Sequence, residues 1–316
     1  MNFKATLLAL LAFALFSTHD VVAKLLGATY SPFQIVFFAS LFSFPLVTIM
    51  LVRDPTQGNL RPVHPWWVAL RSLCVVVAPV AGFYAFTRLP LAQVYAILFS
   101  SPLLITLISI PILKEKVGLW RMLAVVLGLG GVLIVVRPGA TELNLGHAAA
   151  IITALSTAFQ SVIVRKIGRE ERRVVLMLYP LLGSVALMSV ALTFVYQPMQ
   201  LIDLGGMAFV SLFGFCATLL LVYAYTIGEA ALVAPMQYSQ IIWAVIFGML
   251  FFGESPDLPT MLGAAIIVAS GLFIIAREAV GGTSEQTPVL RTRSRGISPS
   301  SMRVSLALKR SDNPRS

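Results

Sequence analysis

The sequence has few charged residues for its length. Only 11% of its 316 residues are Asp, Glu, Lys or Arg, whereas 58% are hydrophobic, and the mean hydropathy is +0.89. A globular protein in water carries roughly 25% charged residues to cover its surface. This composition excludes a soluble globular domain and predicts a polytopic membrane protein, because a chain surrounded by lipid does not need that surface charge.

Residues that carry metal or redox chemistry are also scarce. The two cysteines, Cys74 and Cys216, lie inside apolar runs and form no CxxC pair. The three histidines, His19, His64 and His147, form no cluster with them at metal-ligand spacing. We therefore expect neither a disulfide nor a bound metal.

Signatures of catalysis and of cofactor binding are missing as well. The sequence contains no Walker A, HExxH or GxSxG motif. The glycine run at residues 128–131 lies in mid-span and not at a strand-to-helix turn, so no cofactor is expected. The chain is not expected to be an enzyme. An intramembrane enzyme is the alternative from another class, and only His19 lies inside a span where such chemistry would need it.

Ten apolar runs remain when the chain is cut at charged residues, prolines and glycine clusters. A helix needs about 20 residues to cross the hydrocarbon core. The predicted spans are Phe3 to Leu26, Pro32 to Val52, Trp66 to Phe86, Leu91 to Leu113, Leu119 to Val136, Leu145 to Val164, Val174 to Tyr196, Leu204 to Tyr225, Leu232 to Phe252 and Met261 to Ala276. The chain is therefore predicted to be an all-α membrane protein with ten transmembrane helices.

Positive charge lies mainly on one side of these spans. With a cytoplasmic N-terminus, only Lys24, Arg88 and Arg137 of the 23 Lys and Arg residues fall on the outer side. The positive-inside rule then places both termini in the cytoplasm. The net charge of +10 reflects this topology, so no nucleic-acid partner is expected. Residues 281–316 predict a disordered basic cytoplasmic tail, with binding to anionic headgroups as the alternative role.

The chain contains an internal repeat at an offset of 139 residues, which aligns residues 85–134 with residues 224–273. The aligned pairs include Ala85 with Ala224, Thr87 with Thr226, Ala92 with Ala231, Glu115 with Glu254 and Leu123 with Leu262. Residues 1–140 and 141–280 are therefore interpreted as two five-helix repeats. Because five is odd, the second repeat is predicted to cross the membrane in the opposite orientation, as in secondary transporters that work by alternating access.

Three stretches of this repeat carry a family likeness. They are FYAFTRLPLAQVYAILFSSPLLITLI, then LKEKVGLWRMLAVVLGLGGVLIVVRPG, and the second copy AYTIGEAALVAPMQYSQIIWAVIFGMLFFGES. The sequence resembles the drug/metabolite transporter superfamily, EamA type, over residues 5–277. The resemblance implies a ten-helix carrier with a central cavity lined mainly by spans 1, 3, 4, 6, 8 and 9. The Gly-Glu pair of the family is present at Gly253-Glu254 but is Lys114-Glu115 in the first repeat, and we interpret both glutamates as fold determinants.

The first span adds a finer likeness. The opening FSTHDVVAKLLGATYSPFQIVFF resembles carriers assigned to S-adenosylmethionine or riboflavin uptake in bacteria. This resemblance implies a multi-pass uptake transporter in the bacterial inner membrane. Export of amino acids or drug-like metabolites is the alternative within the same superfamily.

Ionisable residues in the first span are the main site candidates. Such groups inside a membrane cost about 2.5 to 3.5 kcal/mol on insertion scales and mark functional sites. In one interpretation Lys24 extends to the outer interface and Asp20, one turn earlier, is its partner. In the other, Asp20 or His19 takes up a coupling proton or contacts a polar group of the substrate.

Polar and aromatic residues in span 9 are the second group of candidates. Gln237 and Gln240 are three residues apart, as are Gln240 and Trp243, so these side chains and Tyr238 are predicted to line the cavity. Hydrogen bonding between helices is the alternative role of the amides. Further candidates for the lining are Tyr84, Tyr95, Ser100, Gln160 and Tyr223. A tyrosine near a span end also suits the interfacial belt.

An aromatic and amide lining suits a flat, weakly charged or heteroaromatic solute. Riboflavin fits it better than a sugar phosphate, since Arg71 is the one strong cationic candidate and an interfacial anchor is the simpler role for it. The expected partners are this small molecule and membrane lipid. A homodimer, the direction of transport and its energy source stay open.

Overall fold

The computed structural model describes residues 2–52, 60–115, 117–139, 143–168, 170–228 and 230–280. The predicted tail lies outside the described residues. The helices are α1 (Asn2–Leu26), α2 (Pro32–Val52), α3 (Pro65–Arg88), α4 (Leu91–Leu98), α5 (Ser101–Leu113), α6 (Leu119–Val136), α7 (Leu145–Ile167), α8 (Arg173–Val195), α9 (Leu201–Ile227), α10 (Ala230–Val233), the 3₁₀ helix η1 (Ala234–Ser239), α11 (Gln240–Phe252) and α12 (Leu258–Val280).

The helices are long and apolar, as the sequence predicts. Within the described residues, nine of them are long and apolar enough to cross a membrane. The tenth predicted span is α2, in which the apolar stretch Pro32–Pro45 is shorter than these nine. Many large apolar side chains, such as Leu127, Leu250 and Phe194, are exposed on the outside of the bundle, which is the surface that lipid requires. The prediction of an all-helical, multi-pass membrane protein is confirmed.

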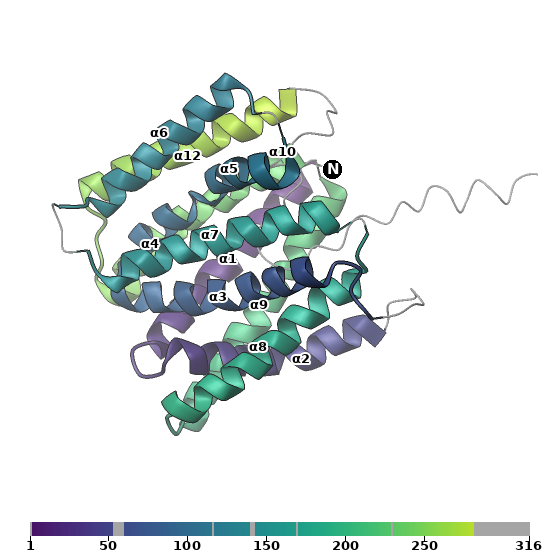
Figure 1. Ribbon diagram of the computed structural model, residues 1–316. Helices are drawn as coiled ribbons and strands as arrows, with labels where there is room; N and C mark the ends of the chain where they lie inside the picture. The colour runs from purple at the N-terminus through teal and green to yellow at the C-terminus, as the bar shows by residue number, and fades with distance from the viewer. Residues whose placement is uncertain are drawn as a thin grey trace, which may run out of the picture.

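The helices pack in pairs that combine the two halves of the chain. α1 packs on α9, α3 on α7, α2 on α8 and α6 on α12. Figure 1 shows α6 and α12 side by side at one edge of the bundle and α2 and α8 at the opposite edge. At the 139-residue offset, α2 and α8 are counterparts, as are α6 and α12, while the α1 and α9 pair is the counterpart of the α7 and α3 pair.

Helix ends repeat at the same offset. α5 begins at Ser101 and ends at Leu113, and α11 begins at Gln240 and ends at Phe252. The next residue in each half, Lys114 or Gly253, has left-handed backbone with φ of 56° or 63°. Glycine adopts this conformation without steric cost, whereas a lysine in it is strained because of its Cβ. The one departure from the Gly-Glu pattern therefore puts a strained residue in the same turn.

Two spans are interrupted in mid-membrane. The span Leu91–Leu113 breaks between α4 and α5, where Pro102 has no N–H to donate to the carbonyl of Leu98. The Ser101 hydroxyl donates to that carbonyl instead, at 2.6 Å. In the second half η1 and its Pro235 occupy the corresponding place before α11. Backbone of this kind is tolerated at membrane depth where protein encloses it.

Glycines let α6 and α12 approach closely. A Cβ on Gly263 would lie 2.6 Å from the carbonyl oxygen of Gly131, and a Cβ on Gly131 would lie 2.9 Å from that of Gly263. Both distances are too short for a side chain. This contact between backbones is the small-residue packing that membrane helices use.

Candidate functional site

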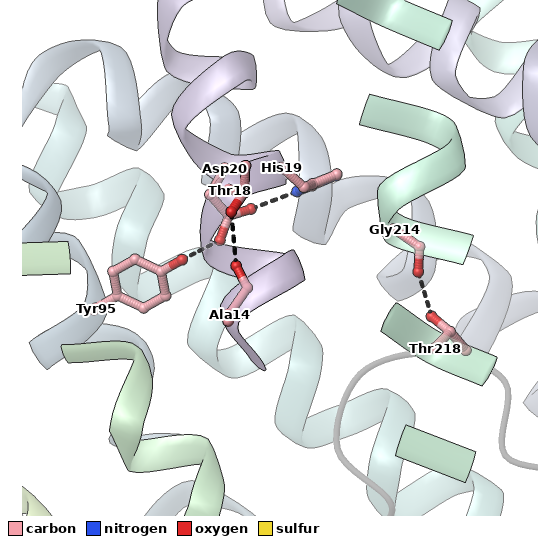
Figure 2. Close-up of polar contacts among 7 residues, drawn as sticks. All are labelled: Ala14, Thr18, His19, Asp20, Tyr95, Gly214 and Thr218. Atoms are coloured by element: carbon pink, nitrogen blue, oxygen red, sulfur yellow. Dashed lines mark hydrogen bonds and ion pairs between the residues drawn. The ribbon is translucent and has the colours of Figure 1, made fainter. Parts of the chain in front are cut away.

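A buried carboxylate lies at the centre of the candidate site. Asp20 of α1 is 3% exposed, and its Oδ2 accepts a hydrogen bond from the Tyr95 hydroxyl of α4. Its Oδ1 lies 2.7 Å from Nδ1 of His19. Figure 2 shows His19 and Tyr95 reaching Asp20 from opposite sides. Both carboxylate oxygens are engaged, which reduces the cost of holding this group inside the membrane.

The His19 side chain of α1 contacts α3 and α9. Its ring centroid is 5.7 Å from that of Phe83 on α3. On the other side a Cβ at Gly214 of α9 would lie 3.4 Å from the imidazole, so glycine leaves the room that the ring occupies. When Nδ1 donates to Asp20, Nε2 is the free nitrogen of the neutral ring. The His19–Asp20 pair therefore lies where α1, α3 and α9 meet.

A row of aromatic rings continues from Tyr95. The centroid distances are 5.8 Å from Phe86 to Tyr95, 5.9 Å from Tyr95 to Phe99 and 5.2 Å from Phe99 to Tyr238. Phe99 and Tyr238 are counterparts at the repeat offset, so the helix breaks of the two halves meet here. The Tyr238 hydroxyl packs on Gly271 of α12, where a Cβ would lie 1.8 Å from it.

The predicted residues next to these breaks are mostly buried. Ser100 is 3% exposed and its hydroxyl donates to the carbonyl of Ile97 at 2.7 Å. Gln240 is 2% exposed. Among the described residues, Nε2 of Gln240 has no hydrogen-bond partner. Gln237 is half-buried, and Trp243 is half-buried with its ring stacked 5.7 Å from Phe247.

The other predicted lining residues are half-buried or exposed. Tyr84 is half-buried, and the Arg88 guanidinium lies 5.4 Å from its ring centroid at the end of α3. Gln160 on α7 is half-buried. Tyr223 on α9 is 56% exposed, which favours the outer surface of the bundle for this side chain.

Lys24 has a partner that the sequence did not indicate. Its ammonium group donates to the Glu254 carboxylate and, at 2.9 Å, to the carbonyl of Leu89. The second oxygen of Glu254 accepts from the backbone N–H of Leu91 at 2.8 Å. The repeat marked Glu254 as a structural residue, but only the fold brings it to α1.

Arg71 is more buried than an interfacial anchor would be. It is 5% exposed and donates to the carbonyl of Leu176 on α8. Leu176 lies four residues before Pro180, so its carbonyl has no N–H donor within the helix. Arg71 supplies that missing donor across the α3 and α8 contact.

One exposed carboxylate outside the spans also contacts both halves. Asp257, just before α12, accepts from the Arg137 side chain and, at 3.2 Å, from the Thr260 N–H. Hydrogen bonding from Thr260, together with the Arg137 guanidinium, holds the pKa of the Asp257 carboxyl below its usual value. Within the described part of the chain, no three His, Cys, Asp or Glu side chains come together as a metal site.

A multi-pass helical protein with a buried ionisable cluster beside two broken spans has the architecture of a membrane carrier. The model of the EamA-like transporter family matches residues 3–137 and again residues 144–276. The chain belongs to the EamA-like transporter family. This membership and its bacterial relatives confirm the predicted superfamily and the multi-pass inner-membrane location.

Three relatives illustrate the range of the family. The S-adenosylmethionine uptake transporter of Rickettsia bellii is 26% identical over 83% of this chain and 90% of its own. Solute carrier family 35 member G1 of Homo sapiens is 30% identical over 85% of this chain and 78% of its own. The riboflavin transporter of Rhizobium johnstonii is 27% identical over 76% of this chain and 78% of its own.

A solved crystal structure has the same fold. It matches with a TM-score of 0.57 over 87% of this chain and 97% of its own, at 19% sequence identity. At that identity the likeness concerns the fold alone. The family and the relatives therefore indicate a transporter. The solute has to be inferred from the residues of the candidate site.

Proposed function

We propose that the chain is a secondary transporter that moves a small organic metabolite by alternating access. In this proposal residues 1–140 and 141–280 are two inverted five-helix repeats, and both termini face the cytoplasm. The two family matches support this division. The pairing of helices supports it too, because a two-fold axis between the repeats would exchange α2 with α8, α6 with α12, and the α1–α9 pair with the α7–α3 pair.

Contacts between connecting segments support the alternation of the spans. Each contact joins two segments that lie on the same side of the membrane if ten successive spans cross it in alternating directions. The contacts are Tyr30 with Asp203, Gln34 with Gln197 and Arg137 with Asp257 on the predicted outer side, and His64 with Glu170 and Glu115 with Arg165 on the predicted inner side.

The buried carboxylate of Asp20 is the observation that favours a particular solute. A carboxylate in a low-dielectric site attracts a cation, and the neighbouring rings of Phe83 and Tyr95 add cation–π attraction. S-adenosylmethionine combines a sulfonium cation with a flat heteroaromatic base. We infer that it is the solute, which is also what the names of the Rickettsia relatives favour.

Riboflavin is the second candidate. The row of rings from Phe86 to Tyr238 suits a flat tricyclic molecule, and a relative at 27% identity is named as its transporter. Riboflavin has no cationic group, so its binding does not call for a buried carboxylate. The two candidates therefore differ in how much they depend on Asp20.

Asp20 and His19 also form the proposed coupling site. A proton on Asp20 removes the charge that the Tyr95 hydroxyl and the His19 ring stabilise, so their hydrogen bonds weaken. A cationic solute and a proton then compete for the same carboxylate. This competition would couple movement of the solute to an opposite movement of protons.

Binding of labelled S-adenosylmethionine to the purified protein in lipid nanodiscs tests the solute. Asp20→Asn is expected to weaken binding about tenfold or more, because it removes the charge that faces the cation. Asp257→Asn is the matched control, since it removes a carboxylate at the end of the bundle, and binding should not change.

Saturable binding of riboflavin alone, unaffected by Asp20→Asn, would replace the first candidate with the second. Absence of binding for both compounds would remove both solute assignments.

A further inference from the structure

Two of the ion pairs between the halves of the chain are largely buried. Lys24 of α1 pairs with Glu254, which follows α11, and Arg165 of α7 pairs with Glu115, which follows α5. Side-chain exposure is 10% and 21% in the first pair and 9% and 12% in the second. Each pair links one family match to the other.

The two pairs occupy corresponding places in the repeats. Glu115 and Glu254 are aligned residues, and each follows the left-handed residue that ends its helix. Their partners lie near the C-terminal ends of the counterpart helices α1 and α7. The fold therefore uses the same device twice, with a lysine in one copy and an arginine in the other.

The pairs lie at opposite ends of the bundle. Glu254 contacts the N–H of Leu91, where the span Leu91–Leu113 begins, while Glu115 is the second residue after the end of that span. The span has 23 residues, which at 1.5 Å per residue is about 34 Å. A span of this length is enough to cross the hydrocarbon core.

At the end of the bundle where α4 begins, the Lys24–Glu254 pair connects α1, α4 and α11. Lys24 also lies 4.8 Å from the ring centroid of Phe252, and Glu254 faces the N-terminus of α4, where helix polarity favours a carboxylate. One turn before Lys24 on α1 and one turn after Leu91 on α4, Asp20 binds Tyr95. The candidate site and this ion pair are thus two successive links between α1 and α4.

At the opposite end, the Glu115–Arg165 pair is reinforced in a similar way. The neighbouring Lys166 donates to the carbonyl of Ile112 at 3.2 Å. Its ammonium group also lies 4.3 Å from the ring centroid of Trp67 on α3. These contacts hold α7 of the second half against α5 and α3 of the first.

We propose that the Lys24–Glu254 and Glu115–Arg165 pairs are the two gates of the transport cycle and that they open one at a time. The proposal rests on the proposed alternating-access function. This structure, with both pairs formed, corresponds to the state closed at both ends. A largely desolvated pair holds its gate shut because separation leaves a charge without a partner, and water admitted by the open gate then solvates that charge.

Labelling of a central cysteine from each side of the membrane tests this. Ser17→Cys is a suitable reporter in a Cys74→Ala, Cys216→Ala background, because Ser17 is 2% exposed and its hydroxyl has no partner within the described residues. Glu254→Gln should raise labelling by a membrane-impermeant maleimide about tenfold from the Lys24 side only. Glu115→Gln should raise it to a similar degree from the opposite side only.

Two controls keep the test specific. Asp257→Asn removes another ion pair between the halves at the Lys24 end, and labelling should stay at the wild-type level. The charge exchange Glu115→Arg with Arg165→Glu should return labelling to the wild-type level, which separates a lost gate from a misfolded protein.

Labelling from the same side in both glutamine variants, or an equal rise with Asp257→Asn, would overturn the assignment. Because labelling requires no solute, the gates can be tested even if S-adenosylmethionine is not transported.

Discussion

The contact between Arg71 and the α8 proline predicts a measurable energetic coupling. The carbonyl of Leu176 is buried and lacks a helical donor because Pro180 has no N–H, so the Arg71 guanidinium is its donor. Arg71→Met should destabilise the protein, since an unsatisfied buried carbonyl costs about 1–3 kcal/mol. Pro180→Ala restores an N–H four residues after Leu176. In that background the same Arg71→Met change should lose this part of its cost.

A double-mutant cycle isolates the effect. The free energy of unfolding of the four proteins would be measured by reversible denaturation in mixed micelles. The effect of losing the Arg71 charge is the same in the Pro180 and Pro180→Ala backgrounds, and the effect of losing the proline kink is the same in the Arg71 and Arg71→Met backgrounds. Both effects cancel in the cycle, which leaves a coupling free energy of about 1–3 kcal/mol. Additivity within about 0.5 kcal/mol would refute the explanation of why this arginine is buried.

Asp20→Asn should abolish uphill accumulation of solute but retain solute exchange at solute concentrations about tenfold higher, because coupling needs the proton whereas binding is only weakened. Undiminished accumulation in proteoliposomes would discard the coupling role. Gly263→Ala should lower thermal stability, because its Cβ meets backbone at 2.6 Å, whereas Gly130→Ala has open space; equal melting shifts would contradict the backbone contact between α6 and α12. The Asp257 carboxyl has a lowered pKa in the folded protein, so it should stabilise the fold at pH values above its unfolded-state pKa of about 3.9 and lose that contribution as the pH falls through its folded-state pKa. Asp257→Asn should therefore reduce the drop in melting temperature at acid pH. An unchanged drop would argue against this contribution.

Much of the fold could be predicted because lipid simplifies the pattern. The apolar run Leu119 to Val136 is α6 to the residue, since Gly118 caps one end of the helix and Arg137 the other. Other ends moved outward: α12 begins at Leu258 and not at Met261, because Pro259 is tolerated in the first turn of a helix. Apolar length alone could not indicate the break before α5, which depends on how Pro102 is accommodated.

The site was predictable by residue type but not by partner. His19 and Asp20 were candidates because ionisable groups in a span are expensive. Their contacts depend on residues far away in sequence, with Tyr95 75 residues from Asp20 and Glu254 230 residues from Lys24. No local sequence pattern encodes such pairs. The sequence therefore predicted Asp20, one turn earlier on the same helix, as the partner of Lys24, whereas the partner is Glu254.

Uptake of labelled S-adenosylmethionine into proteoliposomes, with and without an imposed pH gradient, tests the central claim most directly. The account predicts saturable uptake in the wild-type protein and a response of this uptake to the gradient that is lost with Asp20→Asn. Saturable uptake that is identical in the wild type and in Asp20→Asn would contradict the role of the buried carboxylate, and absence of any S-adenosylmethionine uptake would contradict the choice of solute.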